Sequence, residues 1–85
     1  MIEVFDIHCV KAIIDIIIFL EHSSEEVIDP DISVSTLENF AYELSLMDNA
    51  HKRDFINKVK ILSNQYESNM QDFVKNIPTH LGILP

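Results

Sequence analysis

Two histidines and an aspartate recur along the first part of the chain at a spacing that suggests a metal site. His8, Asp15 and His22 are seven residues apart, which places them in one stripe if the segment is helical. Seven residues are about two helical turns, however, so neighbouring side chains would stand ~10 Å apart along the axis. One zinc ion needs ligands at about 2 Å, and Lys11 in the same stripe would repel it. The pattern therefore predicts a solvated helix edge and no metal ligands.

Adjacent carboxylates are the next candidate, because general acid–base catalysis often uses a pair of them. Glu25 and Glu26 are neighbours, and Asp29 and Asp31 flank Pro30. A catalytic carboxyl group needs an apolar pocket that raises its pKa, whereas this polar segment favours the ionised form. We therefore expect these residues to take no part in catalysis.

Nucleophiles and phosphate-binding signals are equally scarce. The histidine next to Cys9 is His8, which would point about 100° away on a helix. We expect Cys9 to be buried as a small hydrophobe. The single glycine, Gly82, cannot form a phosphate-binding loop. The sequence thus predicts a protein with no enzymatic activity and no cofactor.

The composition predicts one domain, residues 1–85, with an all-α fold. Hydrophobic residues make up 47% of the chain, which is enough for one modest core despite a net charge of −8. One glycine and three prolines leave too few turn residues for a protein built of hairpins. We expect a compact bundle of about four helices with a short apolar C-terminal tail.

Apolar periodicity and capping signals locate these helices. The first segment is rich in isoleucine, but eighteen residues exceed the usual length of a strand. Asp29 and Asp48 are expected N-caps, and Pro78 is expected to make the preceding residue extended and so end the last helix. The predicted ranges are Ile2 or Val4 to Glu21, Pro30 to about Met47, about Ala50 to Gln65, and about Ser68 to Asn76 or Ile77.

The same periodicity predicts which side chains are buried. The first helix should be largely buried, with its neighbours packed antiparallel around it. The second helix should bury a face that includes Val34 and Leu37. The tail residues Leu81, Ile83 and Leu84 should fold back onto the bundle, because an exposed apolar tail invites association.

Charge is distributed unevenly along the chain. Residues 1–48 contain eleven Asp or Glu and one Lys, a balance of −10, whereas residues 49–85 have a balance of +2. A basic run at Lys52, Arg53, Lys58 and Lys60 is expected to be solvated or paired within the molecule. The excess of acid disfavours nucleic acids and anionic membranes as direct ligands and favours a basic protein partner.

One helical face combines several of these acids with an aromatic residue. Asp31, Ser35, Glu38 and Tyr42 fall within about 60° of one another on a helical wheel, turned away from the apolar face. An exposed tyrosine among carboxylates suits a protein interface, although an ordinary solvated face is the alternative interpretation. We define the acidic surface as the nine residues predicted to bind a partner: Glu21, Glu25, Glu26, Asp29, Asp31, Ser35, Glu38, Tyr42 and Glu43.

The location of the protein can also be predicted. The first residues, "MIEVFD", are acidic where a secretion signal is positively charged. The longest apolar run is interrupted at Lys11 and Asp15, short of the ~20 residues that span a membrane. The single cysteine cannot form an internal disulfide, which favours a reducing, cytoplasmic setting.

Two stretches resemble small bacterial helical proteins. They are "LENFAYELSLMDNAHKRDFINKVK", Leu37 to Lys60, and "DFVKNIPTHLGI", Asp72 to Ile83. This likeness lies in apolar spacing and identifies no active residue. More broadly, the chain is similar to the acidic helical immunity proteins that bacteria make against their own nuclease toxins, in colicin-type and contact-dependent inhibition systems. That resemblance implies capture of a basic catalytic domain, although the motif of the colicin DNase immunity proteins is absent.

Two other functions stay open. The chain could be a homo-oligomeric structural protein that pairs through its isoleucine face and its "LGILP" tail. It could also be a small regulatory adaptor with no toxin partner. Sedimentation of the isolated protein distinguishes a homo-oligomer from a monomeric inhibitor. The neighbouring gene distinguishes an adaptor from an immunity protein, because a neighbouring gene product with a basic nuclease-like domain favours immunity.

Overall fold

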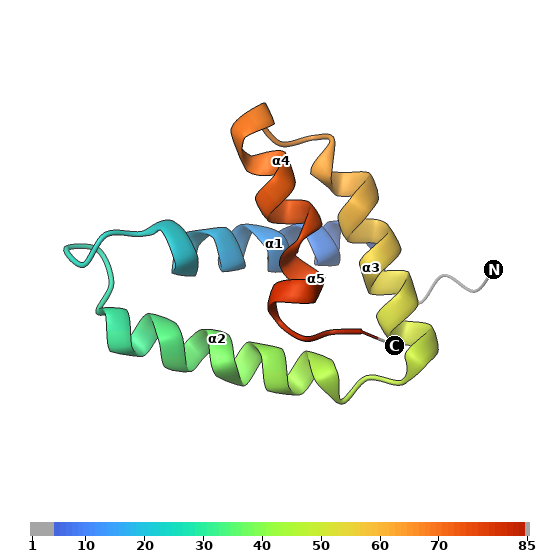
Figure 1. The fold of residues 1–85 in the computed structure, drawn as a ribbon, viewed down its shortest axis with the longest axis horizontal. Helices are drawn as coiled ribbons and strands as arrows, with labels where there is room; N and C mark the ends of the chain where they lie inside the picture. Colours follow the sequence, from blue (N-terminus) through green and yellow to red (C-terminus); the bar gives the residue numbers. More distant parts are fainter. Residues whose placement is uncertain (1–4, 85) are drawn as a thin grey trace.

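The computed structural model describes residues 5–84 and shows an all-α fold, with no strand among those residues (Figure 1). The helices are α1 (Ile7–His22), α2 (Pro30–Ser45), α3 (Asn49–Ser63), α4 (Ser68–Lys75) and α5 (Ile77–His80). Helices α1 and α2 form an antiparallel hairpin, and α3 and α4 form a second hairpin that crosses α1 in this view. The predicted helical bundle is confirmed. Within residues 5–84, no helix has both the length and the apolar character to cross a bilayer.

Aspartate side chains define the starts of three helices. Asp29 and Asp48 cap α2 and α3 as predicted, each accepting a hydrogen bond from a backbone amide of the first turn. Asp6 caps α1 in the same way. These carboxylates satisfy amide groups that have no partner within the helix. The predicted start of the first helix, Ile2 or Val4, lies outside the described residues.

The core lies where α1, α3, α4 and α5 meet. Helix α3 contacts the other three, and so α3 rather than α1 is the central helix. The bundle therefore differs from the predicted arrangement around the first helix. The buried side chains of the core cluster are Val10, Ile14, Ile17, Phe55, Val59, Leu62, Val74, Ile77 and Ile83.

Helix α1 buries a narrower face than predicted. Ile14 and Ile17 are buried, but Ile16 and Phe19 remain 47% and 51% exposed. Cys9 is also exposed, so the prediction that it is buried is wrong. The reason is that α1 packs mainly against α2 and α3, and these neighbours leave its outward face uncovered.

Helix α2 lies at the edge of the molecule (green in Figure 1) and packs mainly against α1. Its one buried residue is Ser33, whose hydroxyl donates a hydrogen bond to the carbonyl of Leu20 at the end of α1. Leu37 and Leu44 are half-buried against the core. Val34 is 55% exposed, contrary to the prediction, because a single neighbouring helix cannot cover the whole apolar face of α2.

The last helix starts where the sequence predicted an end. Helix α4 stops at Lys75, close to the expected boundary, but Ile77 begins α5 with Pro78 in its first turn. The prediction that Ile77 is extended is therefore wrong. A proline in a first turn loses no hydrogen bond, because the amide there would have no helical partner.

Gly82 turns the tail back after α5. Its φ of 71° is left-handed, and its amide donates to the carbonyl of Thr79 at 3.1 Å. The amide of Ile83 donates to the carbonyl of Pro78 at 2.8 Å, which completes a Schellman motif. Ile83 is fully buried, whereas Leu84 is 55% exposed. The predicted return of the tail thus holds for Ile83 and not for Leu84.

Candidate functional site

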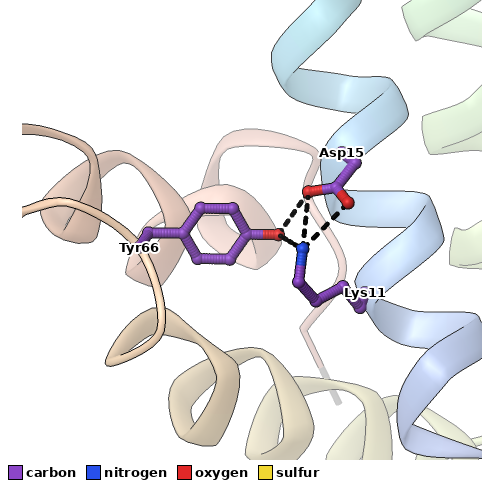
Figure 2. Close-up of polar contacts among 3 residues, drawn as sticks. All are labelled: Lys11, Asp15 and Tyr66. Atoms are coloured by element: carbon purple, nitrogen blue, oxygen red, sulfur yellow. Dashed lines mark hydrogen bonds and ion pairs between the residues drawn. The ribbon is translucent and has the colours of Figure 1, made fainter.

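Two polar side chains of α1 meet a third from a distant part of the sequence on one side of that helix (Figure 2). The ammonium of Lys11 lies 2.9 Å and 3.3 Å from the two carboxylate oxygens of Asp15. The hydroxyl of Tyr66, in the turn after α3, donates to Asp15 at 2.5 Å. This cluster is the first to test for chemistry, because it combines a carboxylate, a phenol and an amine.

The protonation states of the cluster fit a structural role. Partial burial acts to raise the pKa of Asp15, but hydrogen bonds from Tyr66 and Lys11 outweigh it and leave that pKa below its usual value. The hydrogen bond to Asp15 raises the pKa of Lys11, and burial raises the pKa of Tyr66. All three groups therefore keep one protonation state at neutral pH, which is the opposite of what a general acid or base requires.

The helix edge predicted to be solvated is partly covered. In the middle of this edge, Lys11 and Asp15 contact Tyr66. At its end, the rings of His22 and Phe73 pack edge to face, with their centroids 4.7 Å apart. His8 is exposed. Within residues 5–84, no three His, Cys, Asp or Glu side chains gather closely enough to hold a metal ion.

A second polar cluster holds the segment before α1 against α3. The ammonium of Lys58 lies 2.9 Å from the carboxylate of Asp54, and each side chain is only 8% exposed. The amide of Phe5 donates to Asp54 at 3.0 Å, and Lys58 donates to the carbonyl of Phe5. Lys58 is thus paired within the molecule, whereas Arg53 and Lys60 of the same basic run are exposed.

The acidic surface behaves differently from these two clusters. All nine of its residues are exposed. Its carboxylates form no ion pair with any described residue. The acids that form ion pairs within residues 5–84 are Asp15, Asp48 and Asp54, and none of these belongs to the acidic surface. Asp29 alone has an architectural task, since its carboxylate caps α2. Apart from the capping carboxylate of Asp29, the negative charge of the acidic surface is therefore exposed to solvent and is not paired with a cation of residues 5–84.

The end of α1, the following turn and α2 border an open hollow of about 330 Å³, and an adjoining open hollow of about 240 Å³ is bordered by α1, α2 and the end of α5. Both hollows are lined by Glu21, Val34 and Leu37, so they form one continuous depression. We define the hairpin groove as the hollow between α2 and the end of α5, with the principal lining residues Glu21, Val34, Leu37, Glu38, Ala41 and Leu81. Its floor is apolar, and two members of the acidic surface, Glu21 and Glu38, stand at its rim. The adjoining hollow extends the groove toward the α1–α2 turn and adds Glu25.

The other members of the acidic surface do not join the groove. Tyr42 is 63% exposed on α2, one turn beyond Glu38, and is not among the residues that line these hollows. Glu43 lines a separate hollow of about 340 Å³ with Phe40 and Leu44. Ser35 turns its hydroxyl back to a carbonyl of its own helix at 3.2 Å. The surface predicted as one patch thus divides: Glu21, Glu25 and Glu38 line the groove and its extension, Glu43 lines a separate hollow, and Tyr42 lines none of the three.

The groove itself was not predicted. The sequence indicated that Val34 is buried and that Leu81 only returns to the core. The apolar face of the second helix was visible as a signal, but the part of it that stays open depends on α1 and α5, which are distant in sequence. Tyr66 was missed for the same reason, since its partners lie 51 and 55 residues away.

Comparison with known proteins adds no relative. No family model, curated protein or solved structure matches this chain. Function must therefore be inferred from the charge and the shape of the acidic surface and the groove beside it.

Proposed function

We propose that this protein is an immunity or inhibitor protein that binds and neutralises a basic toxin domain, of the nuclease class, through its acidic surface. The observation that carries the proposal is that every predicted contact residue is exposed and that, within residues 5–84, the carboxylates among them pair with no cation. The resemblance of the sequence to acidic immunity proteins supports the nuclease class.

The electrostatics suit such a target. A nuclease domain carries a positive cleft because it must bind a phosphate backbone. A chain with a net charge of −8, whose acids are concentrated in residues 1–48, would be steered toward that cleft and would compete with the nucleic acid for it. Inhibition by this route needs no catalytic group and no cofactor on the inhibitor.

The direct test is affinity capture of the tagged full chain from its own cells, followed by a nuclease assay of the protein that co-purifies. We expect a basic protein whose nuclease activity is suppressed in the complex and returns on dissociation. A Glu38→Lys variant should capture less of it, whereas Asp72→Lys, an equal change of charge at an exposed site on α4, should not. Capture of an acidic partner, or equal capture by both variants, would contradict the proposal.

A homo-oligomeric protein is the second candidate, and one observation favours it. Ile16 and Phe19 are about half exposed on the outward face of α1, where a second copy could cover them. Sedimentation of the isolated chain tests this alternative. A stable dimer that a Phe19→Ser substitution dissociates would support self-association through α1, and a monomer at all concentrations would exclude it.

A further inference from the structure

We infer that the hairpin groove receives the apolar face of a cationic amphipathic helix supplied by the partner. The inference rests on the proposed function for the existence of a basic partner. It adds that the partner is held through an amphipathic helix. The acidic surface alone does not specify such an element.

The floor of the groove is suited to apolar side chains. Val34, Leu37 and Ala41 follow one another at intervals of three and four residues along α2, and Leu81 faces them from the end of α5. Val34 is 55% exposed, and the other three are partly buried. The small side chain of Ala41 leaves room that a larger residue would fill. A groove of this kind between helices is the usual seat for one face of an amphipathic helix.

The length of the depression fits a helix of about three turns. The hairpin groove runs along α2 from Val34 to Ala41, about 10 Å at 1.5 Å per residue. With the adjoining hollow, which reaches Pro30, the length is about 16 Å. An incoming helix could place three or four apolar side chains over that distance, since its own apolar positions recur every three or four residues.

The charge at the rim selects a cationic helix. Glu21 on α1 and Glu38 on α2 are exposed and unpaired within the described chain, and Glu25 extends the acidic edge. No Lys or Arg lines either hollow, and His80 is the one basic side chain that does. Lysine or arginine residues that flank an apolar face would therefore meet the carboxylates that line the groove. A second copy of this chain is disfavoured as the occupant, because it would bring a net charge of −8 toward the same acids.

The test uses the full-length protein and a synthetic probe. The probe is a helical peptide of leucine and lysine in which the leucines lie on one face. Its control has the same composition with the leucines distributed around the helix. In fluorescence anisotropy titrations, the amphipathic probe should bind at least about tenfold more tightly than the control, because only its leucines can enter the groove together. Equal binding of the two peptides overturns the inference.

Matched variants locate the binding to the groove. Val34→Ser should weaken binding of the amphipathic probe about tenfold, because it removes apolar contact from the floor. Ile32→Ser is the control, since Ile32 lies on the same helix, is 58% exposed and lies outside the hairpin groove and the adjoining hollow. Circular dichroism melts check that both variants fold. Equal effects of the two substitutions, or none from Val34→Ser, overturn the inference.

Two further outcomes separate this inference from the proposed function. If Val34→Ser weakens binding of the amphipathic probe but the chain captures no nuclease, the groove assignment holds and the proposed function fails. If the nuclease is captured equally by the wild type and by Val34→Ser, the groove assignment fails and the proposed function stands. A dimer in sedimentation that Val34→Ser dissociates assigns the groove to a second copy and overturns the inference.

Discussion

The α3 side of the molecule and the α2 side use charged residues for different purposes. On α3, Asp54 and Lys58 are paired, almost fully buried and bonded to the backbone of Phe5. On α2, Asp31 and Glu38 are exposed and form no ion pair with any residue of the described part of the chain. The burial of a charge, and not its presence in the sequence, therefore separates a residue that holds the fold from one that is available to a partner.

The apolar residues show the same division. Phe55, Val59 and Leu62 on α3 are buried in the core, whereas α2 buries only Ser33 and leaves Ile32 and Val34 more than half exposed. A helix with so few buried contacts is expected to open locally at a lower free energy than the core helices. Its uncovered apolar area can instead be buried against another protein.

The largest expected effect is the loss of stability when the buried pair on α3 is broken. Asp54→Ala should lower the free energy of unfolding by about 3–5 kcal/mol, because it leaves the charge of Lys58 buried without its carboxylate. Urea denaturation measures the change. The double variant Asp54→Leu with Lys58→Met should recover most of the loss, since it removes both charges together. A loss below about 1 kcal/mol for Asp54→Ala would show that this pair stabilises the fold no more than an exposed ion pair does. The proposed difference between the α3 and α2 sides would then be wrong.

A smaller effect is expected from the cluster on α1. Tyr66→Phe should lower the free energy of unfolding by about 1 kcal/mol. This value is at the low end for a charge-assisted hydrogen bond, because half of the Asp15 side chain is exposed to solvent. The pKa of Asp15 is lowered in the folded state, so its contribution is present above its usual value of 3.8 and is lost as the pH falls through the folded pKa. The pKa of Tyr66 is raised, so its contribution is present below 10.0 and is lost at higher pH.

The stability difference between the wild type and Tyr66→Phe should therefore be constant near neutral pH and shrink at both extremes. Thermal melts across that range measure it. A difference that peaks near pH 7 would instead indicate that a group in the cluster titrates there, which would reopen the case for acid–base chemistry.

The smallest effect on stability is expected on α2. Glu38→Lys should change the free energy of unfolding by less than about 0.5 kcal/mol, because the side chain is exposed and unpaired within the described chain. Urea denaturation beside the α3 variants gives the comparison. A loss as large as that of Asp54→Ala would show that the α2 carboxylates stabilise the fold, and would leave no reason to assign them to a partner.

Features set by local sequence were predictable, and those set by distant contacts were not. The starts of α2 and α3 followed from Asp29 and Asp48, because a cap acts within one helical turn. The buried face of α3 followed from the spacing of Phe55, Val59 and Leu62.

The exposure of Cys9 and Val34 could not be derived in this way, because periodicity identifies an apolar face but not the neighbour that covers it. For the candidate site, the helical wheel predicted the exposed stripe of Asp31, Ser35, Glu38 and Tyr42, but not the hairpin groove beside it. That groove exists only because the end of α5 returns beside α2.

The central claim is that the acidic surface meets a basic protein. The most direct measurement is the association rate of the full chain with the captured partner as ionic strength rises from about 0.05 M to about 0.5 M. We predict a steep fall for the wild type and both a slower rate and a shallower fall for Glu38→Lys. An association rate that responds neither to salt nor to this substitution would contradict the claim.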